Sequence, residues 1–211
     1  MGIRGQLSGF EKEALKLFKL KYAGLEWCEL GCQMNRVRHR PAKQVYEELG
    51  VKHTSIDLAG FWGSLPLDLD YPMPEELLNR FDVVTNYGTI EHVNNQYQVF
   101  KNVHEMCKQN GIMIHGLPRE GSYAGHCRYY YNEDFVNSLS EKCGYTVHNM
   151  RVFAMGPKKR LLSVVFKKQL DNDFITAEEF KNIPLVDTGD TSHTGDYIVK
   201  YYERRRNHRP E

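Results

Sequence analysis

The chain has 211 residues, enough for one well-buried core, and its 41% apolar and 26% charged residues are typical of a globular protein. The 28 basic and 27 acidic residues give a formal charge of +1, so no overall field attracts nucleic acid or anionic lipid. No apolar run approaches the ~18 residues of a membrane span, and the first residues lack a signal-peptide pattern. We therefore expect no membrane partner.

The five cysteines are odd in number and scattered, which favours reduced thiols and a cytoplasmic location over a disulfide framework. Cys28 and Cys32 lie four residues apart, but no second pair at zinc-knuckle spacing accompanies them. The sequence therefore predicts no metal site. A basic tail, Arg204–Arg206 with Arg209, is expected to be solvated rather than to bind phosphate.

Strand and helix patterns alternate along most of the chain. Residues 1–7 are expected to be frayed, and the Ser8–Glu11 segment fits a capping box that begins a helix from Gly9 to about Tyr22. A second helix is expected after Pro41, a proline that suits a first helical turn. The expected strands before the end of the domain are Leu25–Leu30, Val51–Leu58, a trimmed layer at 65–69, Phe81–Asn86 and Gly111–Leu117.

Two further strands, Tyr145–Phe153 and Leu161–Lys168, are joined by a turn short enough for antiparallel pairing. Strands that alternate with helices and then close in a hairpin predict an α/β fold, with a mostly parallel sheet covered by helices on both faces. We expect a helical N-terminal extension at 1–24, a main domain at 25–170 and a polar C-terminal appendage at 171–211, which could act as a lid or a partner contact.

Glu29 and Gly31 stand where the first long strand meets its helix. Ligands bind at the carboxyl ends of the strands in such sheets, and a glycine there lets the backbone approach a ligand closely. A carboxylate favours a ligand with an ammonium group and repels a pyrophosphate. The missing G-x-G-x-x-G pattern also argues against a dinucleotide. The alternative is a strand-end turn with a solvated glutamate.

Polar side chains also follow the next strands. Asp57 could accept hydrogen bonds from both hydroxyls of a ribose, or could cap a turn. Asp68 could accept from an exocyclic amine such as that of adenine, or could be a surface carboxylate. Asn86 and Tyr87 end the strand that begins at Phe81. Because four successive strand ends carry polar groups, we expect one shared ligand site.

The chain resembles the class I S-adenosylmethionine-dependent methyltransferases over roughly residues 25–168. The segments that carry this resemblance are ELG at 29–31, SID at 55–57, LPLDL at 65–69, FDVVTNYGTIEHV at 81–93, NGIMIHGLP at 110–118 and HCRYYYNEDF at 126–135. It implies a Rossmann-like sheet of seven strands, with the last strand antiparallel. It also implies an S-adenosylmethionine cofactor.

The resemblance assigns roles to the strand-end residues. It implies that Glu29 and Gly31 lie near the methionine moiety, that Asp57 holds the ribose, and that Asp68 binds the adenine amine. Their neighbours Leu58 and Leu69, together with Asn86 and Tyr87, are then expected beside the cofactor. The usual loop of this family is E/D-x-G-x-G-x-G, whereas Cys32, Gln33 and Asn35 follow the first glycine here. This bulkier loop could press on the cofactor, or the Gln33 amide could replace lost backbone contacts.

Methyl transfer needs an aligned nucleophile and, for some acceptors, a base that removes its proton. Histidine is the natural base because its unperturbed pKa is ~6.5. His126 and His92 are the favoured candidates. The alternatives are a loop-fixing role for His126, a capping or pocket-lining role for His92, and a core position for a third histidine, His115. Arg128 and the tyrosines at 129–131 could shape an acceptor pocket, or could simply pack.

We therefore predict a methyltransferase that acts on a small-molecule or carbohydrate-like acceptor. Near-zero net charge and the absence of an Asn-Pro-Pro-Tyr-type motif disfavour a nucleic-acid acceptor. The alternative is a methyltransferase-like binding or scaffold protein without turnover, which the altered loop after Gly31 favours. A nucleotide-sugar enzyme is disfavoured because the pyrophosphate loop is missing. The acceptor and the oligomeric state stay open.

Overall fold

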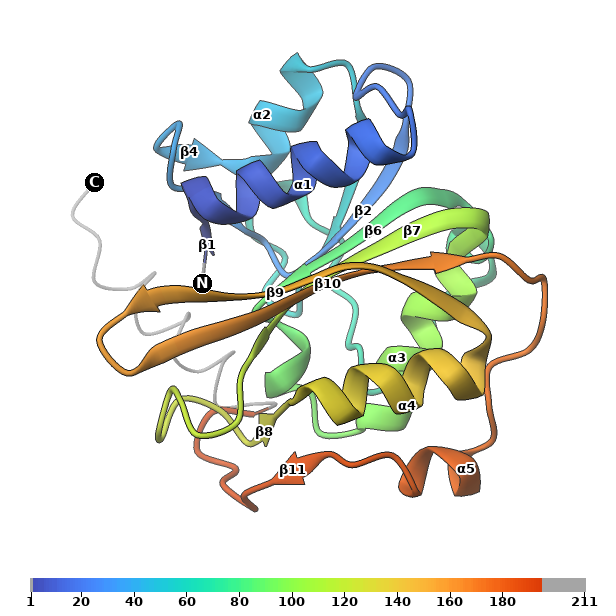
Figure 1. Cartoon of the computed structure of the whole chain (residues 1–211). Helices are drawn as coiled ribbons and strands as arrows, with labels where there is room; N and C mark the ends of the chain where they lie inside the picture. Colours follow the sequence, from blue (N-terminus) through green and yellow to red (C-terminus); the bar gives the residue numbers. More distant parts are fainter. Residues whose placement is uncertain (1, 195–211) are drawn as a thin grey trace.

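The computed structural model describes residues 2–194. Within this range, six strands form a central sheet in the order β5-β2-β6-β7-β10-β9 (Figure 1). These strands are β2 (Glu26–Leu30), β5 (Lys52–Ile56), β6 (Phe81–Tyr87), β7 (Cys107–Pro118), β9 (Tyr145–Gly156) and β10 (Lys159–Lys168). The pairs β5-β2, β2-β6 and β6-β7 are parallel, whereas β10 is antiparallel to both of its neighbours. The α/β class and the antiparallel last strand are confirmed.

The predicted count of seven strands is wrong by one in the described part of the chain. The segment at 65–69 makes only a single parallel bridge, between Leu65 and Ile56 at the end of β5. Pro66 follows directly and has no N–H to donate to a ladder. The connection from β5 is also too short for the crossover helix that a full parallel neighbour requires.

Helices cover both faces of the sheet, as predicted (Figure 1). Helices α1 (Gly5–Leu17) and α2 (Ala42–Glu48) lie on one face, and α3 (Gln96–Met106) and α4 (Glu133–Cys143) lie on the other. The short helix α5 (Ala177–Lys181) packs outside the layer of α3 and α4. The alternation of side chains along a strand divides the core in two. Val83 of β6 packs in the cluster under α1 and α2, and its neighbour Val84 packs in the cluster under α3 and α4. No helix of the described residues is long and apolar enough to cross a membrane.

The N-terminal residues are ordered, which corrects the expectation of a frayed end at positions 2–7. Strand β1 (Gly2–Ile3) pairs with β3 (Met34–Asn35), which in turn pairs with β4 (Arg40–Pro41). Helix α1 begins at Gly5 rather than Gly9, so the expected capping box lies inside it. Its glutamate, Glu11, instead accepts hydrogen bonds from distant tyrosines.

The chain after β10 packs against the core below α3 and α4. Thr176 and Glu179 form a capping box at the start of α5, and Phe174 and Phe180 are buried in the core cluster of that face. Strand β11 (Val186–Asp187) pairs with β8 (Tyr129–Tyr130). The predicted boundaries at 24 and 170 stay a prediction, and the basic tail lies outside the described residues.

Replacing Phe180 with alanine is expected to lower the free energy of unfolding by ~3 kcal/mol, since a buried aromatic side chain would leave a cavity. Urea denaturation measures the change. The matched control is Leu170→Ala, because Leu170 is 55% exposed and its loss is expected to matter little. Equal effects of the two substitutions would contradict a stabilising role for the segment after β10.

Candidate functional site

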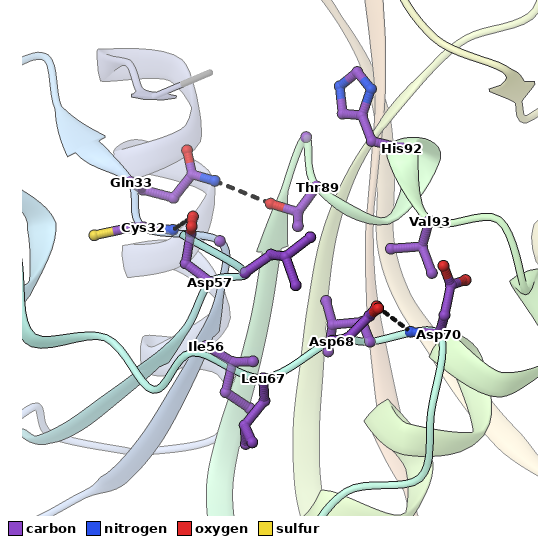
Figure 2. A pocket seen from close by; sticks show the side chains of 14 residues that line it. Cys32, Gln33, Ile56, Asp57, Leu67, Asp68, Asp70, Thr89, His92 and Val93 are labelled. Carbon is purple, nitrogen blue, oxygen red and sulfur yellow. Dashed lines mark hydrogen bonds between the residues drawn. The ribbon is translucent and has the colours of Figure 1, made fainter. Parts of the chain in front are cut away.

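A cavity with about 800 Å³ of empty space, part of it open to solvent, lies at the carboxyl ends of β2, β5 and β6 (Figure 2). Ligand sites occupy this position in open α/β sheets. The loops after the three strands supply its walls, together with the segment at 67–70 and the short 3₁₀ helix Ile90–His92. The predicted convergence of strand ends thus produces a real cavity.

Most of the predicted ligand-binding residues line this cavity. They are Gly31, Gln33, Asp57, Leu58, Asp68 and Leu69, and the candidate base His92 joins them. Four predicted site residues are not among the lining residues: Glu29, Asn86, Tyr87 and the second candidate base, His126. Two lining residues that the sequence did not single out are Asp70 and Thr89.

The lining is acidic. Asp57, Asp68 and Asp70 contribute carboxylates, and residues 2–194 supply no lysine or arginine to the lining. Carboxylates in a partly enclosed site attract a cationic ligand and repel phosphates. The cavity is therefore suited to a ligand with a positive charge rather than to a pyrophosphate.

Asp57 joins two strand ends. Its Oδ2 accepts a hydrogen bond from the backbone N–H of Cys32 at 2.8 Å, and its Oδ1 accepts from the N–H of Ala59 at 2.9 Å. The carboxylate is half-buried and lines the cavity. It therefore has a fixed orientation before any ligand binds.

The other two aspartates order the segment between β5 and β6. Asp68 Oδ1 accepts from the N–H of Asp70 at 3.0 Å, and Asp70 Oδ1 accepts from the N–H of Asn95 at 2.6 Å. Asn95 is the N-cap residue of α3. Asp70 therefore connects the cavity wall to the helix that packs behind it, a contact that sequence spacing alone does not reveal.

Gly31 lies where no side chain fits. Its φ of +76° is a backbone conformation that favours glycine, and an added Cβ would lie 2.2 Å from Thr89 Oγ1. The Thr89 hydroxyl donates to the carbonyl of Leu30 at 2.9 Å, and Gln33 Nε2 donates to Thr89 Oγ1 at 3.2 Å (Figure 2). These side chains bridge the loops after β2 and β6 above the glycine. The Gln33 side chain thus fills space beside Gly31 that would be empty in a glycine-rich loop.

Glu29 lies beneath this loop rather than in the cavity. Its side chain is 1% exposed, and Oε2 accepts from the Gln33 N–H at 3.3 Å. Burial raises its pKa well above the ordinary value of a glutamate. The expectation that Glu29 contacts a ligand directly is corrected to a supporting role under the loop.

Asn86 and Tyr87 do not reach the cavity either. Asn86 is buried, and its Oδ1 accepts from the N–H groups of Thr89 at 3.0 Å and Ile90 at 3.2 Å, so it shapes the turn after β6. Tyr87 is the next residue of the strand and points to the opposite face, where its hydroxyl donates to Glu11 at 2.9 Å. Strand alternation therefore corrects the expectation that Tyr87 lies beside a ligand.

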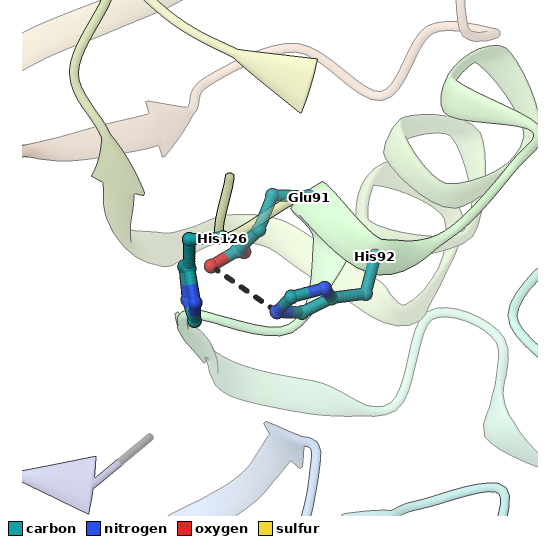
Figure 3. A group of neighbouring side chains, drawn as sticks. All are labelled: Glu91, His92 and His126. Carbon is teal, nitrogen blue, oxygen red and sulfur yellow. Dashed lines mark ion pairs between the residues drawn. The ribbon is translucent and has the colours of Figure 1, made fainter. Parts of the chain in front are cut away.

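The two candidate bases lie together. The His92 and His126 rings meet edge to face, 5.1 Å apart, beside the buried Glu91 (Figure 3). Burial lowers the pKa of His92 to about 3 and that of His126 to about 4, and raises that of Glu91 to about 7. Both imidazoles are therefore neutral near pH 7. Groups with such low pKa values take up protons only weakly.

His115 and the aromatic segment have structural surroundings. His115 is 1% exposed between Phe100 and Phe166 and does not line the cavity. Arg128 forms a paired hydrogen bond with Asp187 at 2.7 Å. The three tyrosine hydroxyls at 129–131 donate to Asn94, Tyr123 and Gln96 respectively. The packing alternative thus describes this segment.

Comparisons with known proteins agree with this architecture. Residues 68–115 match a family model described as a methyltransferase domain. No curated protein matches the sequence significantly. Among solved structures, an S-adenosylmethionine dependent methyltransferase from Mesorhizobium loti is 13% identical with a TM-score of 0.57, and the alignment covers 74% of this chain and 97% of that one.

Two other similar structures are of methyltransferases whose names give different acceptors, a small molecule and an rRNA. The 1,6-didemethyltoxoflavin-N1-methyltransferase of Burkholderia thailandensis, crystallised with 1,6-didemethyltoxoflavin and S-adenosylhomocysteine, is 14% identical with a TM-score of 0.55, covering 70% of this chain and 72% of that one. The 16S rRNA (adenine(1408)-N(1))-methyltransferase of Catenulisporales acidiphilia is 12% identical with a TM-score of 0.52, covering 74% of this chain and 92% of that one.

The matched segment begins at Asp68 in the cavity wall and runs through β6 and α3 to His115 in β7. The matched segment therefore includes one wall of the cavity and β6, a strand in the interior of the sheet. The chain has the Rossmann-like fold of the class I S-adenosylmethionine-dependent methyltransferases, and it resembles that superfamily in sequence.

Proposed function

We propose that this protein is a methyltransferase that binds S-adenosylmethionine in the acidic cavity. The observation that carries the proposal is the convergence of Gly31 and Asp57, at the ends of the neighbouring strands β2 and β5, with Asp68 of the segment at 67–70. The carboxylates suit the ammonium and sulfonium charges of this cofactor, and no lysine or arginine from the described part of the chain lines the cavity to bind a phosphate. When bound, the cofactor supplies a methyl group that is already activated on sulfur.

The residues of the cavity fit the parts of this cofactor. Asp57 is oriented by two backbone N–H groups and would accept from the ribose hydroxyls. Asp68 would accept from the adenine amine, with Leu58 and Leu69 against the apolar faces of the base. Gln33 Oε1 is buried without a hydrogen-bond partner among the described residues, so it is available to an ammonium donor.

We propose a small-molecule or carbohydrate-like acceptor, and a cytoplasmic location in line with five free cysteines. The net charge of +1 gives no general attraction to RNA, although one structural neighbour acts on rRNA. His92 and His126 would contact the acceptor side of the cavity. Their lowered pKa values keep both imidazoles neutral at neutral pH. Each then has a nitrogen lone pair that would accept a hydrogen bond from the methyl acceptor and orient it, and would take up its proton only weakly.

A second candidate is a binding protein of the same fold without turnover. The observation that favours it is the bridge between Gln33 and Thr89, which fills the space above Gly31. Both side chains would have to move for the methionine moiety to lie against that glycine. A protein that binds S-adenosylhomocysteine but transfers no methyl group to any tested acceptor would support this candidate.

S-adenosylhomocysteine is expected to raise the melting temperature of the full chain. At ~100 times the dissociation constant, the gain in the free energy of unfolding is about 2.7 kcal/mol. Differential scanning fluorimetry measures the shift, with NAD and a UDP-sugar as controls that should have no effect. An unchanged melting temperature at millimolar S-adenosylhomocysteine would refute the cofactor assignment.

A further inference from the structure

Three potential metal ligands meet at one edge of the cavity. Glu91 and His92 belong to the 3₁₀ helix Ile90–His92 after β6, and His126 lies in the loop between β7 and β8. One carboxylate oxygen and one nitrogen of each imidazole all lie within 4.8 Å of one another (Figure 3). The chain thus brings together residues that are more than 30 positions apart in the sequence.

Glu91 is the least expected member of this group. It is 0% exposed, and neither carboxylate oxygen has a hydrogen-bond partner among residues 2–194. His126 Nε2 is also buried without a partner in that part of the chain. Buried polar groups are nearly always hydrogen-bonded, and buried carboxylates are paired or coordinate metals. The Glu91 carboxylate therefore needs a partner that the described residues do not supply.

The tautomer of His92 suits coordination. His92 Nδ1 lies 2.9 Å from the backbone carbonyl of His193, and a carbonyl can only accept, so Nδ1 carries the proton. Nε2 is then an unprotonated acceptor, and it lies 3.9 Å from Glu91 Oε1. Metal-bound histidines commonly donate their second nitrogen to a backbone carbonyl in this way. His92 is thus oriented as a ligand would be.

We propose that Glu91, His92 and His126 bind one divalent transition-metal ion. Two imidazoles and one carboxylate form a ligand set that zinc and similar ions accept, with metal–ligand distances of ~2.0–2.2 Å. Small side-chain rotations would bring the three atoms from their present separation to a common ion. A set of three protein ligands leaves coordination positions open.

The metal would stand beside the cavity because His92 belongs to both. A role for the ion in methyl transfer rests on the proposed function. In that case an oxygen atom of the methyl acceptor would bind to an open coordination position of the ion. Binding of the ion itself depends only on the three side chains. The sequence expectation of no metal site rested on cysteine spacing, which says nothing about this group.

Calorimetric titration of the metal-free full chain with Mn²⁺ and Zn²⁺ tests the proposal. We expect one ion per chain for each metal, with Mg²⁺ weaker because it prefers oxygen ligands. Mn²⁺ is included because it binds thiols weakly, so its binding cannot be attributed to the five cysteines, whose soft sulfur ligands could bind Zn²⁺. Glu91→Gln keeps the shape of the side chain and should weaken binding by at least ~100-fold, since even outer partners of a ligand are worth 10–100-fold.

His126→Ala is the second variant, so that the test does not depend on the folding of one protein. His39→Ala is the control, because His39 is exposed and outside the group, and it should bind as wild type. No binding to wild type, or equal binding to wild type and both variants, would overturn the proposal. The S-adenosylhomocysteine shift of the metal-free protein is a separate measurement, so failure of the metal site and failure of the cofactor site are distinguishable.

Discussion

Replacing Glu11 with alanine is expected to lower the free energy of unfolding by ~3 kcal/mol or more, because two buried tyrosine hydroxyls and one half-buried hydroxyl would lose their acceptor. Glu11 is 3% exposed on α1. Its carboxylate accepts hydrogen bonds from Tyr46 at 2.6 Å, Tyr22 at 2.8 Å and Tyr87 at 2.9 Å. These tyrosines come from α2, the segment before β2, and β6, so one carboxylate connects three parts of the fold to α1.

The charge state of Glu11 is set by two opposing effects. Burial raises its pKa, and the hydrogen bonds from Tyr46, Tyr22 and Tyr87 oppose that rise. A single Tyr46→Phe substitution removes one donor and leaves the other two, so it is expected to cost only about 1 kcal/mol. The loss of the shared acceptor should therefore exceed the loss of any one donor.

Urea denaturation followed by circular dichroism measures these changes. Glu13→Ala is the matched control, since Glu13 lies on the same helix, is exposed, and pairs with Arg151 at the surface. Its replacement should change stability by about 0.5 kcal/mol or less. A Glu11→Ala protein as stable as the Glu13→Ala protein would show that the tyrosines find other partners.

Replacing Asp57 with alanine is expected to weaken S-adenosylhomocysteine binding by ~100-fold. Hydrogen bonds to a charged group are worth about 1.5–3 kcal/mol, and each 1.4 kcal/mol is a factor of ten in affinity. The same change also releases the Cys32 N–H, which now donates to Asp57 at 2.8 Å. The loop beneath the ligand would therefore lose its attachment to the end of β5.

Isothermal titration calorimetry with S-adenosylhomocysteine measures the affinity. Asp57→Asn keeps one oxygen acceptor and should fall between wild type and Asp57→Ala. Asp173→Ala, at an exposed position outside the cavity, is the control and should bind as wild type. Wild-type affinity in the Asp57→Ala protein would remove the ribose assignment.

Local sequence pattern placed two acidic residues that line the cavity. Asp57 and Asp68 were predicted at the ligand edge because polar residues follow the apolar strand segments, and both line the cavity. Parallel strands bring their carboxyl ends to one edge, so this placement follows from strand order along the chain. The same rule did not separate Tyr87 from Asn86, since alternation along β6 sends adjacent side chains to opposite faces.

Other features depend on contacts between distant residues. Glu11 fits a capping box by local spacing, yet three tyrosines from elsewhere take its carboxylate. Thr89 and Gln33 meet above Gly31 although 56 residues separate them. In each case a buried polar group takes the partner that the packed core offers, and a local motif cannot compete with burial.

The α/β class, the antiparallel last strand and the acidic residues after the strands follow from the order of amino acids alone, because apolar periodicity and strand-end position are local properties. Packing between distant elements, in contrast, places Glu91 beside His92 and His126 without a hydrogen-bond partner among the described residues, and buries Glu29 under the loop after β2 rather than in the cavity lining. The physical reason is that burial depends on which elements pack together. That packing assigns each polar side chain its partner, or leaves it without one.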